Sequence, residues 1–196
     1  MRTIVLARHG PPIWDHSTPI AGRDLAAWVA GIDAAPIATT NGPSAGLLDH
    51  ARSCDVAVAS TLRRSIESVR FAAPDKPLVV EAIFREVFLP TAFRSAVRMR
   101  PAIWKAIART GWYAGWSPGV ETHAGARARA HTAALVLDAL SAERGNVLLI
   151  GHGTMNGMIG KRLLRMGWRG PLFRPRKHWA FAVYRRAEES VGRRSS

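Results

Sequence analysis

The chain has 196 residues and a mean hydropathy of −0.03, an ordinary balance for one folded domain. Its 28 Lys and Arg residues outnumber 14 Asp and Glu residues, for a formal net charge of +14. The single cysteine, Cys54, excludes an intrachain disulfide framework, and no apolar stretch approaches the length of a signal peptide core or a membrane span.

We therefore expect a cytoplasmic protein with no membrane association. The excess of positive charge predicts either a solubilising surface or a field that attracts anions. Such a field attracts phosphorylated metabolites, nucleic acid or acidic lipid. The charge does not choose among them, and the sequence leaves the oligomeric state open.

Apolar periodicity predicts alternating strands and helices along most of the chain. Strands are expected at residues 2–7, 55–60, 77–83, 146–152 and 178–186. Helices are expected at residues 22–32, 45–52, 61–73, 122–144 and 153–167, with a loop at residues 33–44. This alternation indicates a three-layer α/β/α sandwich with a mostly parallel central sheet.

The pattern weakens between residues 90 and 120. A helix is expected at residues 96–110, interrupted or kinked at Pro101, and Trp104, Trp112 and Trp116 cluster in and after it. The segment is either a small helical insert that caps a site or an extra core helix followed by a turn. We expect residues 1–187 to form one domain that includes this insert, and residues 188–196 to form a flexible tail.

Polar residues of one kind follow three of the expected strands. Arg8-His9-Gly10 follows the first strand, Ser60 with Arg63 and Arg64 follows the second, and Gly151-His152-Gly153 follows the fourth. In open α/β sheets, ligands bind beyond the carboxyl ends of the strands, where helix N-termini also attract anions. Histidines, arginines and helix N-termini that meet at one edge predict a phosphate pocket.

Four motifs resemble those of the histidine phosphatase superfamily, in its phosphoglycerate-mutase-like branch. "VLARHG" is similar to the opening motif, with His9 as the nucleophile. "ASTLRRSIES" is similar to the second arginine motif and identifies Arg64 rather than Arg63 as the phosphate ligand, while "LLIGHG" matches the second histidine motif at His152. "FREV" places Glu86 where the family has its acid. The resemblance spans nearly the whole chain, and residues 90–120 are its least constrained part.

The resemblance implies catalysis through a phosphohistidine. A neutral imidazole at His9 attacks phosphorus, Arg8 and Arg64 hold the phosphoryl oxygens, and His152 donates a hydrogen bond to them. Glu86 would protonate the leaving oxygen and later accept a proton from water. Each residue type therefore fits a step of phosphoryl transfer.

Gly10 and Gly153 complete the implied phosphate site, because a glycine lets the backbone approach the ligand closely. No metal or organic cofactor is expected, since the arginines and histidines supply the positive charge. The remaining histidines lack the spacing of metal ligands; they are His16, His50, His123, His131 and His178.

The chain departs from the family pattern after its first motif. Pro12 and Asp15 stand where the form "RHGxTxxN" has threonine and asparagine. An aspartate would repel phosphate there, so either Asp15 points away or the substrate binds differently. Glu121, in "PGVETHAG", is a second candidate acid, and His16 and Arg85 are possible further site residues.

We accordingly expect a metal-independent phosphoric monoester hydrolase that acts on a small phosphomonoester or a phosphoprotein. A phosphoglycerate-type mutase is a narrower form of this prediction. A catalytically weak or inactive module that binds phosphate or nucleic acid on the same fold is the alternative from another class.

Overall fold

A computed structural model describes residues 1–172 and 177–187 of the chain. Its main sheet has the strand order β4-β3-β6-β1-β7. The first four of these strands are mutually parallel and β7 runs antiparallel to β1. In chain order they are β1 (Arg2–Arg8), β3 (Val56–Ala59), β4 (Leu78–Val80), β6 (Val147–Gly151) and β7 (Phe181–Arg186).

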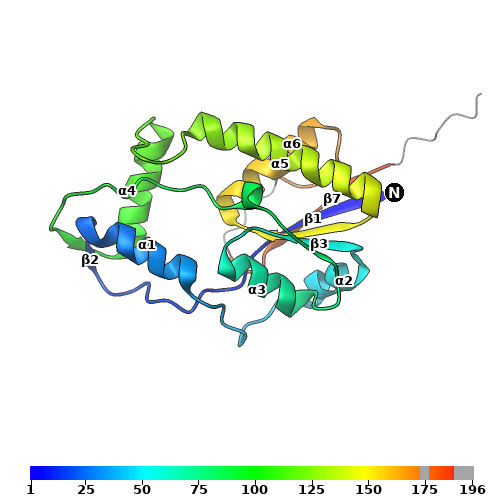
Figure 1. Ribbon diagram of the computed structural model, residues 1–196, viewed down its shortest axis with the longest axis horizontal. Coiled ribbons are helices and arrows are strands. Elements are labelled where there is room, and N and C mark those ends of the chain that lie inside the picture. Colours follow the sequence, from blue (N-terminus) through cyan, green and yellow to red (C-terminus); the bar gives the residue numbers. More distant parts are fainter. Residues whose placement is uncertain (173–176, 188–196) are drawn as a thin grey trace, which may run out of the picture.

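Helices cover both faces of this sheet (Figure 1). The longer ones are α1 (Leu25–Ala34), α2 (Ala45–Ser53), α3 (Arg63–Ala72), α4 (Pro101–Tyr113), α5 (His123–Arg144) and α6 (Gly153–Arg165). Two 3-10 turns lie at Gly22–Asp24 and Ala82–Phe84. The arrangement confirms the predicted α/β fold with a mostly parallel sheet.

Alternation along the strands explains why the sandwich has three layers. In β1, Ile4 and Leu6 pack in a cluster with α5 and α6, whereas Val5 and Ala7 pack on the opposite face with α2 and α3. Side chains that point to opposite faces in turn are the natural consequence of a strand buried on both sides. The described helices include none that is long and apolar enough to cross a bilayer.

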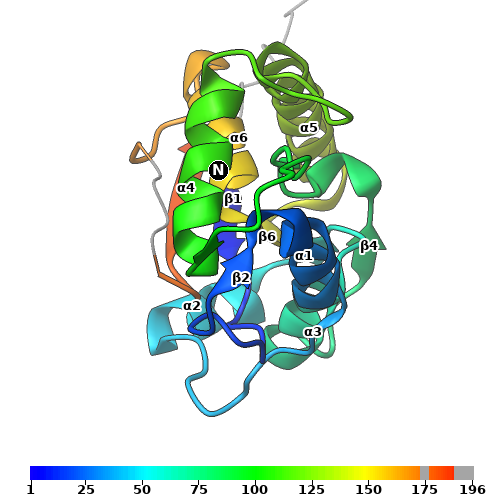
Figure 2. The same cartoon turned by 90° about the vertical axis from the view of Figure 1, so that its left-hand side faces the viewer.

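A third, smaller cluster lies beyond the carboxyl ends of the parallel strands. It joins α1 to α4 through Leu25, Trp28 and Trp104, next to a two-stranded ribbon of β2 (Ile20–Ala21) and β5 (Arg98–Met99). Figure 2 looks onto this end of the molecule, with α4 and α1 in front. Trp112, on a different face of α4 from Trp104, is buried in the cluster formed with α5 and α6 instead. Helix α4 therefore belongs to the core and also stands over the edge of the sheet.

The structure corrects the prediction for residues 96–110. There is no kinked helix, because α4 begins at Pro101 and residues Arg98–Met99 form β5. Proline fits the first position of a helix, where its missing N–H has no intrahelical partner to lose. The third strand is also shorter than expected, since residues Ala82–Phe84 form a 3-10 turn. The expected tail at 188–196 lies outside the described residues.

Candidate active site

The sheet register brings the two histidine motifs together. β1 and β6 are parallel neighbours, and Arg8 lies opposite Gly151, so His9 and His152 leave the sheet side by side. The His9 N–H donates to the Gly151 carbonyl at 2.9 Å, and the two imidazole centroids are 5.1 Å apart. Because β3 pairs with the other side of β6, Ser60 joins the same edge. Three predicted groups thus meet where the strands end.

His9 is held as a neutral imidazole in one orientation. It is buried, and its Nδ1 lies 2.7 Å from the Gly10 carbonyl oxygen. A carbonyl only accepts, so Nδ1 carries the proton and Nε2 keeps its lone pair. Burial lowers the pKa of His9 well below its ordinary value, and the charges of His152 and Arg64 lower it further.

His152 is fully buried, with Nε2 2.7 Å from the Ser60 hydroxyl oxygen. That oxygen also accepts the Leu62 N–H at 3.2 Å. Among the described residues, no group bonds to His152 Nδ1. Burial lowers the pKa of His152 well below its ordinary value, followed by the charges of Arg64 and Arg8. Both imidazoles are therefore neutral at pH 7.

Of the two adjacent arginines that begin α3, only Arg64 turns into the site. It is 7% exposed, and its charge acts on both imidazoles. Its guanidinium donates to the Asp33 carboxylate at 2.7 Å, an ion pair that fixes it against α1. Arg63 is exposed and pairs with Glu67 instead. The structure thus places Arg64, and not Arg63, beside the two imidazoles.

The two candidate acids occupy different surroundings. Glu86 lines the main cavity together with Arg8, and its carboxylate accepts the Thr154 and Met155 N–H groups at 3.2 and 3.0 Å, at the start of α6. Glu121 forms an ion pair with Arg129 and is not among the cavity-lining residues. Glu121 therefore has a structural partner, whereas Glu86 faces the space where a substrate would lie.

Arg8 is the last residue of β1 and lines the cavity. Burial lowers its pKa, the carboxylate of Glu86 acts in the opposite direction, and the charges of Arg64 and Arg109 lower it again. Arg85 lies at the margin, with a weak 3.4 Å hydrogen bond to the Thr61 hydroxyl, and its charge reaches His152.

The two glycines of the predicted site have different surroundings. Gly153 begins α6 and lines the cavity. The Gly10 N–H donates to the Ser68 hydroxyl at 2.9 Å. A Cβ at Gly10 would lie 2.5 Å from the Trp179 ring, so the absence of a side chain is required by this packing.

The exposed loop after the first motif resolves the question raised by Asp15. Its carboxylate accepts the Ser17 N–H and hydroxyl, both at 2.8 Å, and the Thr18 N–H at 3.1 Å. Hydrogen bonds from the side chain of Thr18, from Ser17 and from the Thr18 N–H hold the pKa of Asp15 well below its usual range. Asp15 is therefore turned into its own loop. His16 lies edge-on to Trp28, with ring centroids 5.5 Å apart.

Sequence reasoning missed His178 as a site residue. Its ring centroid is 5.1 Å from that of His9, and its Nδ1 donates to the His9 carbonyl at 3.0 Å. Burial, then the charge of Arg8, lowers its pKa to about 4. His178 precedes β7, which is antiparallel, so the start of β7 lies at the edge where the parallel strands end. The sequence carries no signal for this reversal, so reasoning from motifs could not place His178 at the site.

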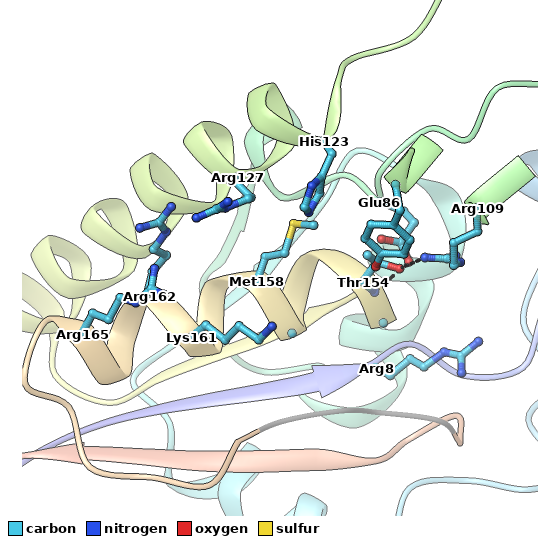
Figure 3. A pocket seen from close by; sticks show the side chains of 13 residues that line it. Arg8, Glu86, Arg109, His123, Arg127, Thr154, Met158, Lys161, Arg162 and Arg165 are labelled. Atoms are coloured by element: carbon cyan, nitrogen blue, oxygen red, sulfur yellow. Dashed lines mark hydrogen bonds between the residues drawn. The ribbon is translucent and has the colours of Figure 1, made fainter. Parts of the chain in front are cut away.

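A cavity of about 840 Å³ extends from this edge along α6, beneath α4 and α5 (Figure 3). Arg109 of α4 closes one side by donating to the Thr154 hydroxyl at 2.7 Å. Basic side chains dominate its lining: Arg8, Arg109, Arg127, Lys161, Arg162 and Arg165. Within residues 1–172 and 177–187, no group of three His, Cys, Asp or Glu side chains is placed to hold a metal ion.

Comparison with known proteins gives a family match over most of the chain. The family model of the histidine phosphatase superfamily (branch 1) matches residues 44–183. This span includes Arg64, Glu86 and His152, and it begins after His9. No curated protein sequence matches the chain significantly.

Solved structures share the fold at low identity. A putative alpha-ribazole-5'-P phosphatase from Escherichia coli is 18% identical, with a TM-score of 0.58 and coverage of 93% of this chain and 90% of that one. A mycobacterial glucosyl-3-phosphoglycerate phosphatase in complex with VO3 is also 18% identical, with a TM-score of 0.55 and the same coverages. A mutant phosphoserine phosphatase from Entamoeba histolytica, in complex with phosphoserine, is 13% identical, with a TM-score of 0.56 and again 93% and 90% coverage.

Proposed function

Since the chain belongs to the histidine phosphatase superfamily, we propose that it is a metal-independent phosphatase that hydrolyses a phosphomonoester through a phosphohistidine on His9. The observation that carries this proposal is the state of the His9 ring. Its Nδ1 proton is committed to the Gly10 carbonyl, so the Nε2 lone pair is available beside His152 and Arg64. A buried, neutral and oriented imidazole is what in-line attack on phosphorus requires.

In the first step, His9 Nε2 forms a bond to phosphorus while the bond to the leaving oxygen breaks. The leaving oxygen takes that electron pair and receives a proton from Glu86, which lines the cavity next to Arg8. In the second step, water attacks the phosphohistidine and gives its proton to Glu86. Inorganic phosphate leaves, and His9 returns to the neutral state.

The surrounding side chains supply the electrostatic part of the mechanism. Arg8 and Arg64 offer guanidinium groups to the phosphoryl oxygens. The Ser60 hydroxyl oxygen accepts from Leu62 and donates its own proton to His152 Nε2, which leaves the His152 proton on Nδ1. That N–H is the donor that a phosphoryl oxygen would meet, and a preorganised donor of this kind contributes about 3 kcal/mol to transition-state stabilisation.

Hydrolysis fits the cavity better than a mutase reaction. Tyr113, Arg127, Lys161 and Arg165 line it and are exposed, so the cavity reaches solvent and water has access to the intermediate. A mutase must instead return the phosphoryl group to a retained product. We place the reaction in the cytoplasm, in keeping with the single buried thiol of Cys54, and expect a small phosphorylated substrate or a phosphoprotein.

The test is hydrolysis of a generic phosphomonoester in chelator between pH 5 and 8, with His9→Ala as the decisive variant. We expect turnover by the wild type and a loss of at least about 10⁴-fold in kcat for His9→Ala. His131→Ala, at an exposed position of α5, is the matched control. A rapid quench in alkaline denaturant during turnover should trap a phosphoryl group on His9, because phosphohistidine survives alkali and is lost in acid.

Equal turnover by wild type and His9→Ala would overturn the proposed mechanism. Absence of turnover, together with salt-sensitive binding of RNA or DNA, would favour the alternative of a nucleic-acid-binding module, because counterion release makes such binding fall steeply with salt.

A further inference from the structure

The cavity has a second cationic region, away from the histidines. Arg127 of α5 and Lys161, Arg162 and Arg165 of α6 line its far end. Figure 3 shows them separated from Arg8 and Glu86 by Met158 and His123. We name these four residues the distal basic cluster.

The distal basic cluster has no acidic partner within the described part of the chain. Some carboxylates elsewhere form ion pairs with other cations, such as Asp138 with Arg2 and Arg186. Among the described residues, Glu86 is the one carboxylate that lines the cavity, and it lies at the opposite end beside Arg8. Four like charges that face one cavity repel one another, and a bound anion would relieve that repulsion.

The distance between the two ends exceeds the size of a phosphate group. Helix α6 begins at Gly153, so Lys161 and Arg165 stand eight and twelve residues further along it. At the rise of an α-helix, these positions are about 12 and about 18 Å from the start of α6. One phosphoryl group held by His9 and Arg64 therefore lies beyond the reach of Arg165, the farther of the two.

The middle of the cavity suits an uncharged connecting group. Tyr113, His123 and Met158 line it. The Tyr113 and His123 rings are 5.1 Å apart and nearly perpendicular, and His123 packs edge-on against the buried Trp112. These contacts form a wall of ring edges and a thioether, which packs against apolar or ring-shaped matter.

We propose that the substrate is an elongated small molecule with two phosphate groups, one cleaved at His9 and the other held by the distal basic cluster. This inference rests on the proposed function. The volume of about 840 Å³ is that of a small-molecule site, and helices enclose it on several sides. A second phosphate in contact with two or three basic side chains should raise kcat/KM through binding.

The first experiment compares octane-1,8-diol bisphosphate with octyl phosphate and with propane-1,3-diol bisphosphate. We expect kcat/KM for the eight-carbon bisphosphate to exceed that for octyl phosphate by about 10-fold to 100-fold at low salt, and the gap to narrow as salt screens the exposed cluster. The three-carbon bisphosphate, too short to reach the cluster, should show a much smaller advantage.

The second experiment removes the charges. Arg162→Gln combined with Arg165→Gln should reduce the ratio of kcat/KM for the eight-carbon bisphosphate to kcat/KM for octyl phosphate toward one. Arg52→Gln combined with Arg70→Gln makes the same charge change on α2 and α3, on the opposite face of the sheet, and should keep the wild-type ratio.

Binding separates failure of this inference from failure of the proposed function. The probes are octane-1,8-bisphosphonic acid and octylphosphonic acid, which cannot be hydrolysed. Tighter binding of the bisphosphonate that is lost in the Arg162 and Arg165 double variant supports the distal site, whether or not any ester is turned over. Absence of turnover together with this binding pattern would overturn the proposed function and leave the distal site standing. Equal affinity for the two phosphonates would overturn the inference. An affinity for a 5'-phosphorylated oligonucleotide higher than that for the bisphosphonate would also overturn it.

Discussion

The two ends of the cavity are both basic but are built in opposite ways. At the strand ends, His9, His152 and Arg64 are buried and fixed by named partners, namely Gly10, Ser60 and Asp33. In the distal basic cluster, the side chains stand on helix surfaces, and Arg127, Lys161 and Arg165 are exposed.

This difference separates chemistry from affinity. Burial keeps the imidazoles neutral and their geometry fixed. The rate of a reaction that depends on this geometry falls by a large factor when one catalytic group moves. Exposed cations are screened by water and salt, so each contributes modestly to binding. Changes at the strand ends should therefore affect kcat strongly, and changes in the cluster should affect substrate preference.

The largest effect in this comparison is expected at Glu86, which lies beside Arg8 at the catalytic end of the cavity. Glu86→Gln keeps the size of the side chain but cannot transfer a proton, so we expect kcat/KM for an alkyl phosphate, which reports the first step alone, to fall by about 10²-fold to 10⁴-fold. The loss in kcat/KM should be much smaller for p-nitrophenyl phosphate, whose leaving group needs no proton. Steady-state kinetics with the two substrates measures this difference.

Glu121→Gln is the matched control, since Glu121 pairs with Arg129 outside the cavity lining. We expect it to lower stability while the two-substrate pattern stays that of the wild type. If Glu121→Gln abolished the alkyl phosphate reaction and Glu86→Gln did not, the roles of the two acids would be reversed.

The second prediction concerns pH and applies to the strand ends alone. Because the pKa values of His9 and His152 lie well below 6.5, both imidazoles stay neutral as pH falls from 7 to below 6. We expect kcat/KM for the free enzyme to show no acidic limb near pH 6.5. A half-loss of kcat/KM centred at pH 6.5 would mean that His9 titrates like an exposed histidine.

The same pKa shifts predict acid-sensitive stability. An unfolded histidine binds a proton near pH 6.5, whereas folded His9 and His152 do not. The contribution of these two neutral imidazoles to the free energy of unfolding is therefore fully present above pH 6.5. It should decrease as pH falls below that value, by about 1.4 kcal/mol per pH unit for each group. Denaturant unfolding between pH 7 and 5 measures this slope, and His152→Ala should remove one group's share.

A smaller effect is expected from the ion pair that fixes Arg64. Asp33→Asn leaves a guanidinium that is 8% exposed without its anionic partner. We expect stability to fall by about 1–3 kcal/mol. Inorganic phosphate should restore part of that loss, because the phosphate would take the place of the carboxylate.

Asp49→Asn is the control for this substitution, since its partner Arg52 is 69% exposed on α2. It should change stability by under about 0.5 kcal/mol, with no added response to phosphate. A phosphate response equal in Asp33→Asn and the wild type would show that Arg64 does not contact the anion.

The sequence predicted the sandwich because its signals were local. Strand β6 is a run of apolar residues fully buried on both faces, and strands of this kind can be recognised without knowledge of their neighbours. The two-stranded ribbon of β2 and β5 could not be found in this way, since each strand has two residues and pairs across a long stretch of chain. Pro101 was misread for a related reason, as a proline can equally start or kink a helix.

The site followed the same division. Arg8, His9, Arg64, Glu86 and His152 were selected from strand ends and motifs, and the structure gathers them at one edge. His178 was missed because its position depends on β7 running antiparallel, which the sequence does not show. The distal basic cluster was visible only as a general excess of charge, since its geometry depends on α5 lying beside α6.

The smallest effect should come from Asp15, an exposed charge close in sequence to the buried His9. If its charge opposed phosphate binding, Asp15→Asn would raise kcat/KM. The carboxylate is instead occupied by Ser17 and Thr18, and an asparagine can accept the same hydrogen bonds. We expect Asp15→Asn to change kcat/KM by less than about two-fold, because exposed charges are weakly coupled through water.

Asp15→Ala, which cannot hold the turn, should have the larger effect of the two. Steady-state kinetics on octyl phosphate ranks them, and an increase of ten-fold or more in Asp15→Asn alone would show that Asp15 faces the phosphate after all.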